Sequence, residues 1–290
     1  MPLIESLMYN MKEAHYNPIT IFHGMLYGAT VTYLRVLKNL LRFGSPSFRK
    51  HVEETYHSKV VRLNDATKFI TINKNIELKN LEQVLPYKHA KDIILKNPQN
   101  IVAYECACRA QAQAPCKPSD VCLIIGEPFV DLVRMLQPLR SRRISVEEAL
   151  DILKEEDNRG HVHTAWFKTA MLDRFYAICN CCKCCCLGIK SMKEYKMRSV
   201  LPSGYRAITK DDCIGCGECA KNCQFEAIEM ITKTDNGKKK EIAKIIPEKC
   251  FGCGICESKC KNENISIIID DSKGIPLSIE NLAQTVETTI

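Results

Sequence analysis

The sequence lacks the motifs with which most redox enzymes bind an organic cofactor. It contains no GxGxxG dinucleotide fingerprint and no P-loop, and no Ser/His/Asp order stands out as a catalytic triad. Nothing in it marks a flavin site. Two-electron chemistry would therefore have to take place on a metal centre or on a partner protein, which favours a subunit or carrier over a self-sufficient enzyme.

The N-terminus lacks both the basic start and the apolar run of a signal peptide over Met1–His15, so we expect a cytoplasmic protein. Residues 19–43 carry apolar side chains at roughly helical spacing, interrupted by Gly24 and Gly28 and followed by basic side chains. Three interpretations stay open. The segment is a helix in the core or against a partner, a helix lying peripherally on the inner face of a membrane, or a spanning helix, for which it is short of the roughly 20 apolar residues required.

Cysteine is the residue that the sequence has in excess, at 18 among 290 residues. In a short secreted protein this would predict disulfides, but this chain is long and its cysteines stand at ligand spacing, which indicates metal in a reducing compartment. The net charge is +7, from 41 basic and 34 acidic residues. Because an oxidised cubane with its four thiolates carries about −2, we interpret the basic excess as compensation and expect no nucleic-acid partner.

One cysteine pattern, Cys-x2-Cys-x2-Cys-x3-Cys, occurs twice near the C-terminus. The two copies are Cys213, Cys216, Cys219 and Cys223, and Cys250, Cys253, Cys256 and Cys260. Gly215 and Gly217 in the first copy match Gly252 and Gly254 in the second. Alternating apolar stretches at 227–231 and 265–269 predict a strand after each short helix. A zinc site also uses paired CxxC, but it needs only four ligands and no third CxxC step.

Residues 205–270 resemble the bacterial-type two-cluster ferredoxins, whose cysteine spacing is highly specific. The resemblance implies a ferredoxin-like α+β fold with two [4Fe–4S] clusters and crossed ligation, in which the fourth cysteine of each run serves the other cluster. Cys260 would then complete the set begun at Cys213, and Cys223 the set begun at Cys250. The family usually has proline after the fourth cysteine. Here Gln224 and Lys261 stand in those places, and each regains an N–H donor.

Ten further cysteines lie upstream. They are Cys106, Cys108, Cys116, Cys122, Cys179, Cys181, Cys182, Cys184, Cys185 and Cys186. Adjacent side chains diverge by about 180° on a strand and about 100° on a helix, so the 179–186 run more naturally serves two clusters on opposite sides of the backbone. Cys106 and Cys108, two apart in extended chain, can face the same way. We predict about two further clusters built jointly from 106–122 and 179–186, with Arg109, Asn180 and Lys183 as candidates to donate to sulfur or balance charge.

The elements Cys106-Ala-Cys108-Arg109 and Ile178–Cys186, followed by the ferredoxin unit, are similar to those of a group of ferredoxin-domain proteins of anaerobes. That resemblance implies an architecture and no particular reaction. Alternatives remain for the upstream cysteines, which include free buried thiols, a redox-active disulfide, and an unusual cluster with a substrate-facing iron. His161 and His163 are metal ligands, a proton relay, or packing residues.

The sequence predicts an α+β protein in four parts. These are an amphipathic docking segment at 1–50, a mainly helical cysteine-rich module at 51–200, the ferredoxin-like dicluster domain at 205–270, and a tail at 271–290. Within the module we predict a strand at Lys68–Ile72 and a helix over 81–95 interrupted near Pro86. Ser145-Val-Glu-Glu148 is typical of a helix capping box.

Taken together, the patterns predict an oxygen-sensitive electron carrier. It would relay single electrons between donor and acceptor proteins through about four [4Fe–4S] clusters, roughly 16 irons per chain, as part of a hetero-oligomeric oxidoreductase. The alternative is a redox enzyme whose 179–186 segment acts on a thiol, disulfide or other small substrate. A third possibility is a scaffold that holds clusters without redox turnover. No catalytic residue is assigned.

Overall fold

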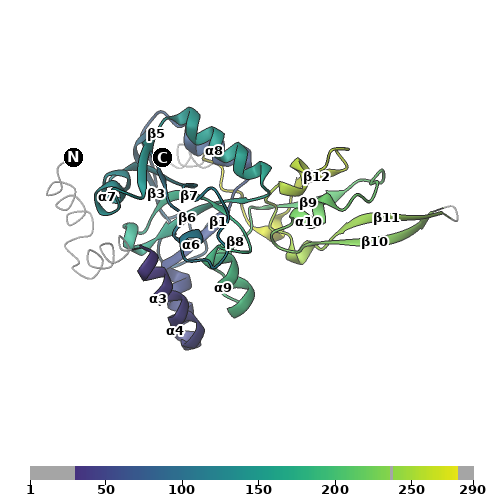
Figure 1. Cartoon of the computed structure of the whole chain (residues 1–290), viewed down its shortest axis with the longest axis horizontal. Coiled ribbons are helices and arrows are strands. Elements are labelled where there is room, and N and C mark those ends of the chain that lie inside the picture. The colour runs from purple at the N-terminus through teal and green to yellow at the C-terminus, as the bar shows by residue number, and fades with distance from the viewer. Residues whose placement is uncertain (1–29, 236–237, 280–290) are drawn as a thin grey trace.

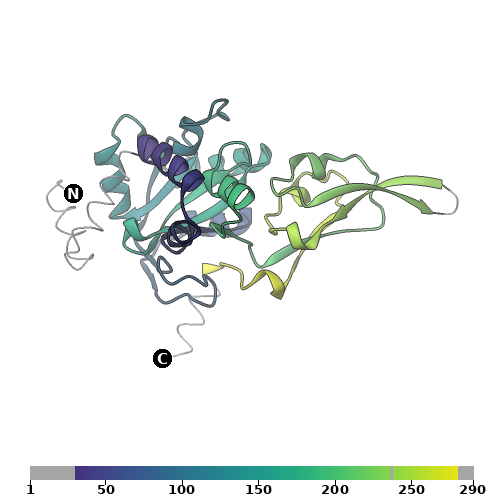
Figure 2. The ribbon, with the colours of Figure 1, turned by 90° about the horizontal axis from the view of Figure 1, so that it is seen from below.

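The structure is a computed structural model and describes residues 30–235 and 238–279. The amphipathic segment predicted at 19–43 therefore lies partly outside the described residues, as does the end of the predicted tail. Figure 1 shows two lobes side by side, a larger one built from residues 30–201 and a smaller one from 205–269. A long hairpin of the smaller lobe points away from the larger one in both views (Figures 1 and 2).

The larger lobe is built on a curled sheet of eight strands, so the prediction of a mainly helical region is wrong. Seven strands follow the order β2-β3-β4-β7-β6-β1-β8, and β5 pairs with β3 off this path. The strands are β1 (Tyr56–Val60), β2 (Ile76–Leu78), β3 (Ile93–Tyr104), β4 (Cys122–Glu127), β5 (Ser141–Ile144), β6 (Val162–Lys168), β7 (Arg174–Cys181) and β8 (Val200–Leu201). β6 is buried at every position, and such a strand shows no alternation to distinguish it from a buried helix.

Two local predictions in this lobe are also wrong, and one is confirmed. Lys68–Ile72 is not a strand, because helix α5 (Leu63–Thr71) places Ala66, Phe69 and Ile70 on one buried face. Residues 81–92 form turns that lead into β3 rather than a helix, as fits a segment that contains Pro86. The capping box is present, since Ser145 Oγ accepts a hydrogen bond from Glu148 N at 3.1 Å at the start of helix α8 (Val146–Asn158).

The two faces of the sheet differ in chemistry. One face packs α5 and α8 over an apolar core that includes Phe69, Leu153 and Phe175. The other face carries cysteines and aromatic side chains and lies near α6 (Ala107–Ala110), α7 (Phe129–Leu136) and α9 (Leu187–Tyr195). Alternation along the strands separates these faces.

The described part of the N-terminal segment is helix α3 (Thr30–Phe43), which α4 (Pro46–Thr55) follows. Leu34, Leu37 and Leu41 of α3 are buried in a cluster with Ala107 of α6 and Leu187 of α9. This is the spacing of an amphipathic helix packed on a protein body. Within residues 30–235 and 238–279, no helix is both long enough and apolar enough to cross a bilayer.

The smaller lobe consists of two antiparallel strand pairs and two short helices. β9 (Tyr205–Thr209) pairs with β12 (Ile265–Ile269), and β10 (Ile228–Asp235) pairs with β11 (Lys238–Ile245). Helices α10 (Glu218–Asn222) and α11 (Ile255–Ser258) each contain the third cysteine of a run. The predicted strand at 265–269 is confirmed, and that at 227–231 begins one residue later and continues further. Gly252, at φ +64°, lies so close to Tyr205 O that a Cβ would approach it to 2.1 Å, which requires glycine.

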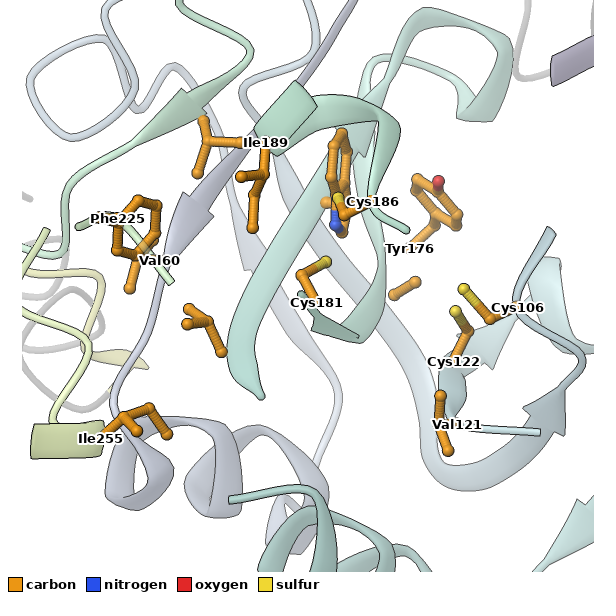
Figure 3. Packing of buried hydrophobic residues seen from close by; sticks show 14 of the residues in the cluster. Val60, Cys106, Val121, Cys122, Tyr176, Cys181, Cys186, Ile189, Phe225 and Ile255 are labelled. Carbon is orange, nitrogen blue, oxygen red and sulfur yellow. The ribbon is translucent and has the colours of Figure 1, made fainter. Parts of the chain in front are cut away.

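The two lobes share one apolar core and several polar contacts. Phe225 and Ile255 of the smaller lobe belong to the same buried cluster as Val60 and Ile189 of the larger one (Figure 3). Around it, Arg62 Nη2 lies 3.0 Å from Glu257 Oε2, and Lys259 Nζ donates to Asn158 O at 2.7 Å. The lobes are therefore held against each other through both apolar and polar contacts.

Candidate iron–sulfur sites

The eight C-terminal cysteines gather into two groups that cross between the runs. Cys213, Cys216 and Cys219 line one cavity together with Cys260. Cys250, Cys253 and Cys256 line another together with Cys223. In each case the fourth thiol comes from the other half of the repeat. This is the grouping that the resemblance to two-cluster ferredoxins implies for the ligands, and their ligation itself stays a prediction.

Backbone N–H groups point at four of these sulfurs in two matched pairs. Ala227 N donates to Cys223 Sγ at 3.3 Å, and Asn264 N to Cys260 Sγ at 3.2 Å, each four residues further along the chain. Ala243 N donates to Cys213 Sγ and Ala207 N to Cys250 Sγ, both at 3.4 Å. Such donors stabilise thiolates and are one of the ways in which a protein sets a cluster's reduction potential. The donor set and its surroundings therefore fit a pair of iron–sulfur clusters.

Burial has a clear effect on these thiols. It raises the pKa of Cys219 to about 11 and that of Cys253 to about 12. Free thiols with such pKa values would stay protonated at neutral pH. Because metal binds the thiolate, loading of each site must release protons.

Comparison with known proteins assigns the smaller lobe to a type of iron–sulfur domain. Residues 212–264 match the family model of the 4Fe-4S dicluster domain. The chain therefore carries 4Fe–4S clusters in its dicluster domain, and iron–sulfur electron transfer is the activity that this domain supplies. No curated protein matches the chain.

Eight of the ten upstream cysteines line one mostly apolar cavity in the larger lobe. Two of them, Cys182 and Cys185, belong to a second group described below. The other six are Cys106, Cys108, Cys122, Cys179, Cys181 and Cys186. Their thiols contact one another in the order Cys179, Cys122, Cys106, Cys108, Cys186, Cys181. Figure 3 shows Cys106 beside Cys122, and Cys181 near Cys186. We call this group the six-cysteine cavity.

Strand geometry explains part of the gathering. Cys179 and Cys181 lie two apart on β7, so their side chains share a face. The side chain of Asn180 between them lies on the other face, where its Oδ1 forms a hydrogen bond with His163 Nδ1 at 2.6 Å. We predicted that Cys106 and Cys108 lie in extended chain. They lie instead at the start of the short helix α6. They contact each other nevertheless.

The other four upstream cysteines form a second group nearer the surface. The Sγ atoms of Cys116, Cys182, Cys184 and Cys185 all lie within 4.8 Å of one another. A turn over 182–186, closed by the hydrogen bond from Cys186 N to Cys182 O at 3.0 Å, separates these thiols from Cys186. The thiols of the 179–186 run thus fall into two groups, which the turn separates, while their service to two clusters stays a prediction. We call the second group the four-cysteine site.

Arg109 is a buried cation at the wall of the six-cysteine cavity. Its Nη2 donates to Glu156 Oε2 at 2.5 Å and to Asn180 O at 3.1 Å, while its Nε has no hydrogen-bond partner within the described residues. Burial opposes the charge, but the hydrogen bond and charge of Glu156 hold the pKa of Arg109 above its usual value. A fixed positive charge with a free donor beside six thiols fits an anionic cluster in the cavity.

The remaining candidates have structural partners. His161 Nδ1 lies 2.7 Å from Glu156 Oε2, so both predicted histidines take part in buried hydrogen bonds rather than facing the thiols. Lys183 Nζ lies 3.4 Å from Glu226, away from the cavity. The sequence did not indicate that Glu156 belongs to this site. In the sequence it is one of several acidic residues near the end of a helix.

Proposed function

We propose that this protein relays single electrons between its dicluster domain and the upstream cysteine module, as a subunit of a larger oxidoreductase complex. One contact carries the proposal. Lys183, in the middle of the 179–186 run, donates its backbone N–H to Gln224 Oε1 at 2.9 Å, and Gln224 directly follows Cys223. The upstream cysteines and a predicted cluster ligand of the dicluster domain are thus only a few bonds apart.

The order of centres follows from this contact. The cluster expected on Cys213, Cys216, Cys219 and Cys260 does not include Cys223, the ligand next to Gln224, so it is the outer cluster of the relay. The cluster expected on Cys250, Cys253, Cys256 and Cys223 adjoins the larger lobe. Of the four clusters that the sequence predicts, the geometry supports these two and one in the six-cysteine cavity. The cavity is the inner end of the relay.

A partner surface is available on α3. Val36, Leu40 and Phe43 are exposed to 52%, 50% and 80%, and the same helix carries the exposed basic side chains Lys38 and Arg42. An exposed apolar strip on a basic helix suits an acidic-rimmed redox partner or a peripheral position at an anionic membrane. We propose that the protein is cytoplasmic, because its free thiols require reducing conditions.

Anaerobic purification with iron and sulfide counting, followed by a potentiometric titration monitored by electron paramagnetic resonance, tests the relay. The expected result is at least three centres that each take up one electron reversibly, with signals that broaden when neighbouring centres are reduced together. Centres that hold iron but do not change oxidation state would instead indicate a cluster scaffold. Iron and sulfide confined to the dicluster domain would remove the upstream half of the relay.

A second function, a redox enzyme, is favoured by one observation. The six-cysteine cavity offers two thiols more than a cubane requires and is lined by apolar side chains such as Tyr104, Met171 and Tyr176. A cavity of this kind could admit a small thiol, disulfide or apolar substrate to a centre with an incompletely ligated iron. Carbon monoxide and a small thiol added to the reduced protein discriminate the two, because only a substrate-accessible centre changes its spectrum.

A further inference from the structure

The four-cysteine site differs from the other cysteine groups in how tightly its sulfurs are held. Cys116 Sγ lies 3.1 Å from Cys184 Sγ and 3.7 Å from Cys182 Sγ. Cys184 Sγ lies 3.0 Å from Cys182 Sγ and 3.8 Å from Cys185 Sγ. Among the residues that the structure describes, no other set of three or more thiols, imidazoles and carboxylates is gathered so closely. In the two dicluster groups and the six-cysteine cavity, no three sulfurs all lie within 4.8 Å of one another.

Sulfur separation reports what a site can hold. Four thiolates around one tetrahedral ion, each about 2.3 Å from the metal, lie about 3.8 Å from one another. A cubane instead binds each thiolate to a different iron at a separate corner, which spreads the four sulfurs much further apart. The separations in the four-cysteine site, none above 4.8 Å, suit a single ion and are too short for a cubane.

The local backbone gives the four-cysteine site its own set of sulfurs, although Cys182 and Cys185 also border the cavity. Three of its thiols come from the turn over 182–186, and the fourth comes from the loop that contains Cys116. Cys186 leaves this turn toward Cys108 and Cys181, so it belongs to the cavity. Cys184 is exposed and Cys116 half-buried, whereas four of the six cysteines of the six-cysteine cavity are buried. An ion can therefore reach the four-cysteine site directly from solvent.

We infer that the four-cysteine site binds one thiophilic transition-metal ion, zinc or iron, through four thiolates, and no iron–sulfur cluster. The ten upstream cysteines are then divided six and four, not into two sets for cubanes. The bound ion joins the Cys116 loop to the turn that also contacts Gln224. This inference goes beyond the electron relay and does not depend on it.

A pair of double variants in the full chain tests the inference. Cys116→Ala with Cys184→Ala removes two ligands of the four-cysteine site. Cys216→Ala with Cys260→Ala is the matched control, since it also removes two cysteines, one of them exposed, from different parts of the chain. Iron, zinc and acid-labile sulfide are counted in each anaerobically purified protein. The first variant should lose one metal ion per chain and no sulfide, and the control should lose about four irons and about four sulfides.

Each outcome decides the question. Loss of one zinc or of one iron without sulfide supports the inference and identifies the ion. Loss of iron together with sulfide from the first variant, or no metal loss at all, overturns it. If the first variant does not fold, the unmodified protein is examined directly. X-ray absorption should show zinc with four sulfur neighbours at about 2.3 Å, or Mössbauer spectra of iron-enriched protein should show one high-spin iron apart from the clusters. Absence of both signals overturns the inference.

Discussion

Gln224 accepts a hydrogen bond from the backbone N–H of Lys183 at 2.9 Å and donates one through Nε2 to Gly160 O at 2.7 Å. It stands where two-cluster ferredoxins usually have proline. Proline offers neither contact, so the departure from the family pattern has a structural reason in this chain. The equivalent position in the other half of the repeat, Lys261, is exposed. Gln224, unlike the exposed Lys261, therefore links its half of the domain to the larger lobe.

Replacing Gln224 with alanine should loosen this contact without removing a cluster. Two hydrogen bonds are lost, worth about 1 kcal/mol each. Hydrogen exchange of the Lys183 amide should accelerate about tenfold or more, while the iron content of the dicluster domain stays unchanged. If the relay runs through this contact, electron transfer between the two lobes should slow as well.

Lys261→Ala is the matched control for that variant. It changes the symmetry-related residue beside Cys260 but faces solvent, so Lys183 exchange should stay as in the unmodified protein. Equal acceleration in both variants would mean that the effect comes from the dicluster domain as a whole and that the Gln224 contact is unimportant.

Crossed ligation can be tested by counting iron in two triple variants. Changing Cys216, Cys219 and Cys260 to alanine removes three ligands of one expected cluster, so about four irons should be lost. Changing Cys216, Cys219 and Cys223 instead strikes both expected clusters, and the loss should approach eight. The two proteins differ only in which fourth cysteine is missing. If each run bound its own cluster, the order of the two losses would be reversed.

The dicluster domain was predictable because its cysteine spacing is set by an inorganic core of fixed size. The strand at 265–269 and the Ser145 cap followed from equally local rules. The fold of the larger lobe was not predictable, because β6 and much of β7 are buried on both faces and show no alternation of apolar and polar residues that marks them as strands. Its sheet also depends on pairings between distant segments, such as β1 with β6.

The upstream site was predictable only in outline. Divergence of adjacent side chains indicated two groups in the 179–186 run. Which thiol joins which group depends on β7 ending at Cys181 and on the turn that follows, and no local pattern states where that strand ends. The role of Glu156 was hidden for a similar reason, since its partner Arg109 lies 47 residues away in the chain.

The Arg109–Glu156 pair should be one of the most sensitive points of the larger lobe. Both side chains are almost completely buried, and removal of one partner from such a pair typically costs about 3–5 kcal/mol. Arg109→Met should therefore lower the free energy of unfolding by that amount, measured by denaturant titration under anaerobic conditions. If the six-cysteine cavity holds a cluster, loss of the nearby positive charge should also lower its reduction potential.

Arg159→Met provides the comparison for that prediction. Arg159 Nη1 contacts the same carboxylate, 3.0 Å from Glu156 Oε1, but its side chain is 38% exposed. Exposed pairs contribute about 1 kcal/mol or less, so this variant should be nearly as stable as the unmodified protein and keep its potentials. Similar losses in the two variants would show that burial of Arg109 is not what matters.

His57 should make the larger lobe sensitive to acid. Its ring lies 3.1 Å from Glu53 O through Nδ1 and 2.9 Å from Ala90 O through Nε2, and it stacks on Tyr87. Burial lowers the pKa of this histidine to about 4. In the unfolded chain its pKa returns to about 6.5, so above that pH the ring is neutral in both states and makes no difference to stability. As the pH falls from about 6.5 toward 4, only the unfolded state gains the proton, and the folded state should lose about 2 kcal/mol by pH 5.

His57→Phe keeps the aromatic stack and should flatten the stability profile between pH 7 and 5, even if it lowers stability overall. His51→Gln, which changes an exposed histidine of α4, should leave the slope as it is. An unchanged slope in His57→Phe would mean that the folded state accommodates the charged ring.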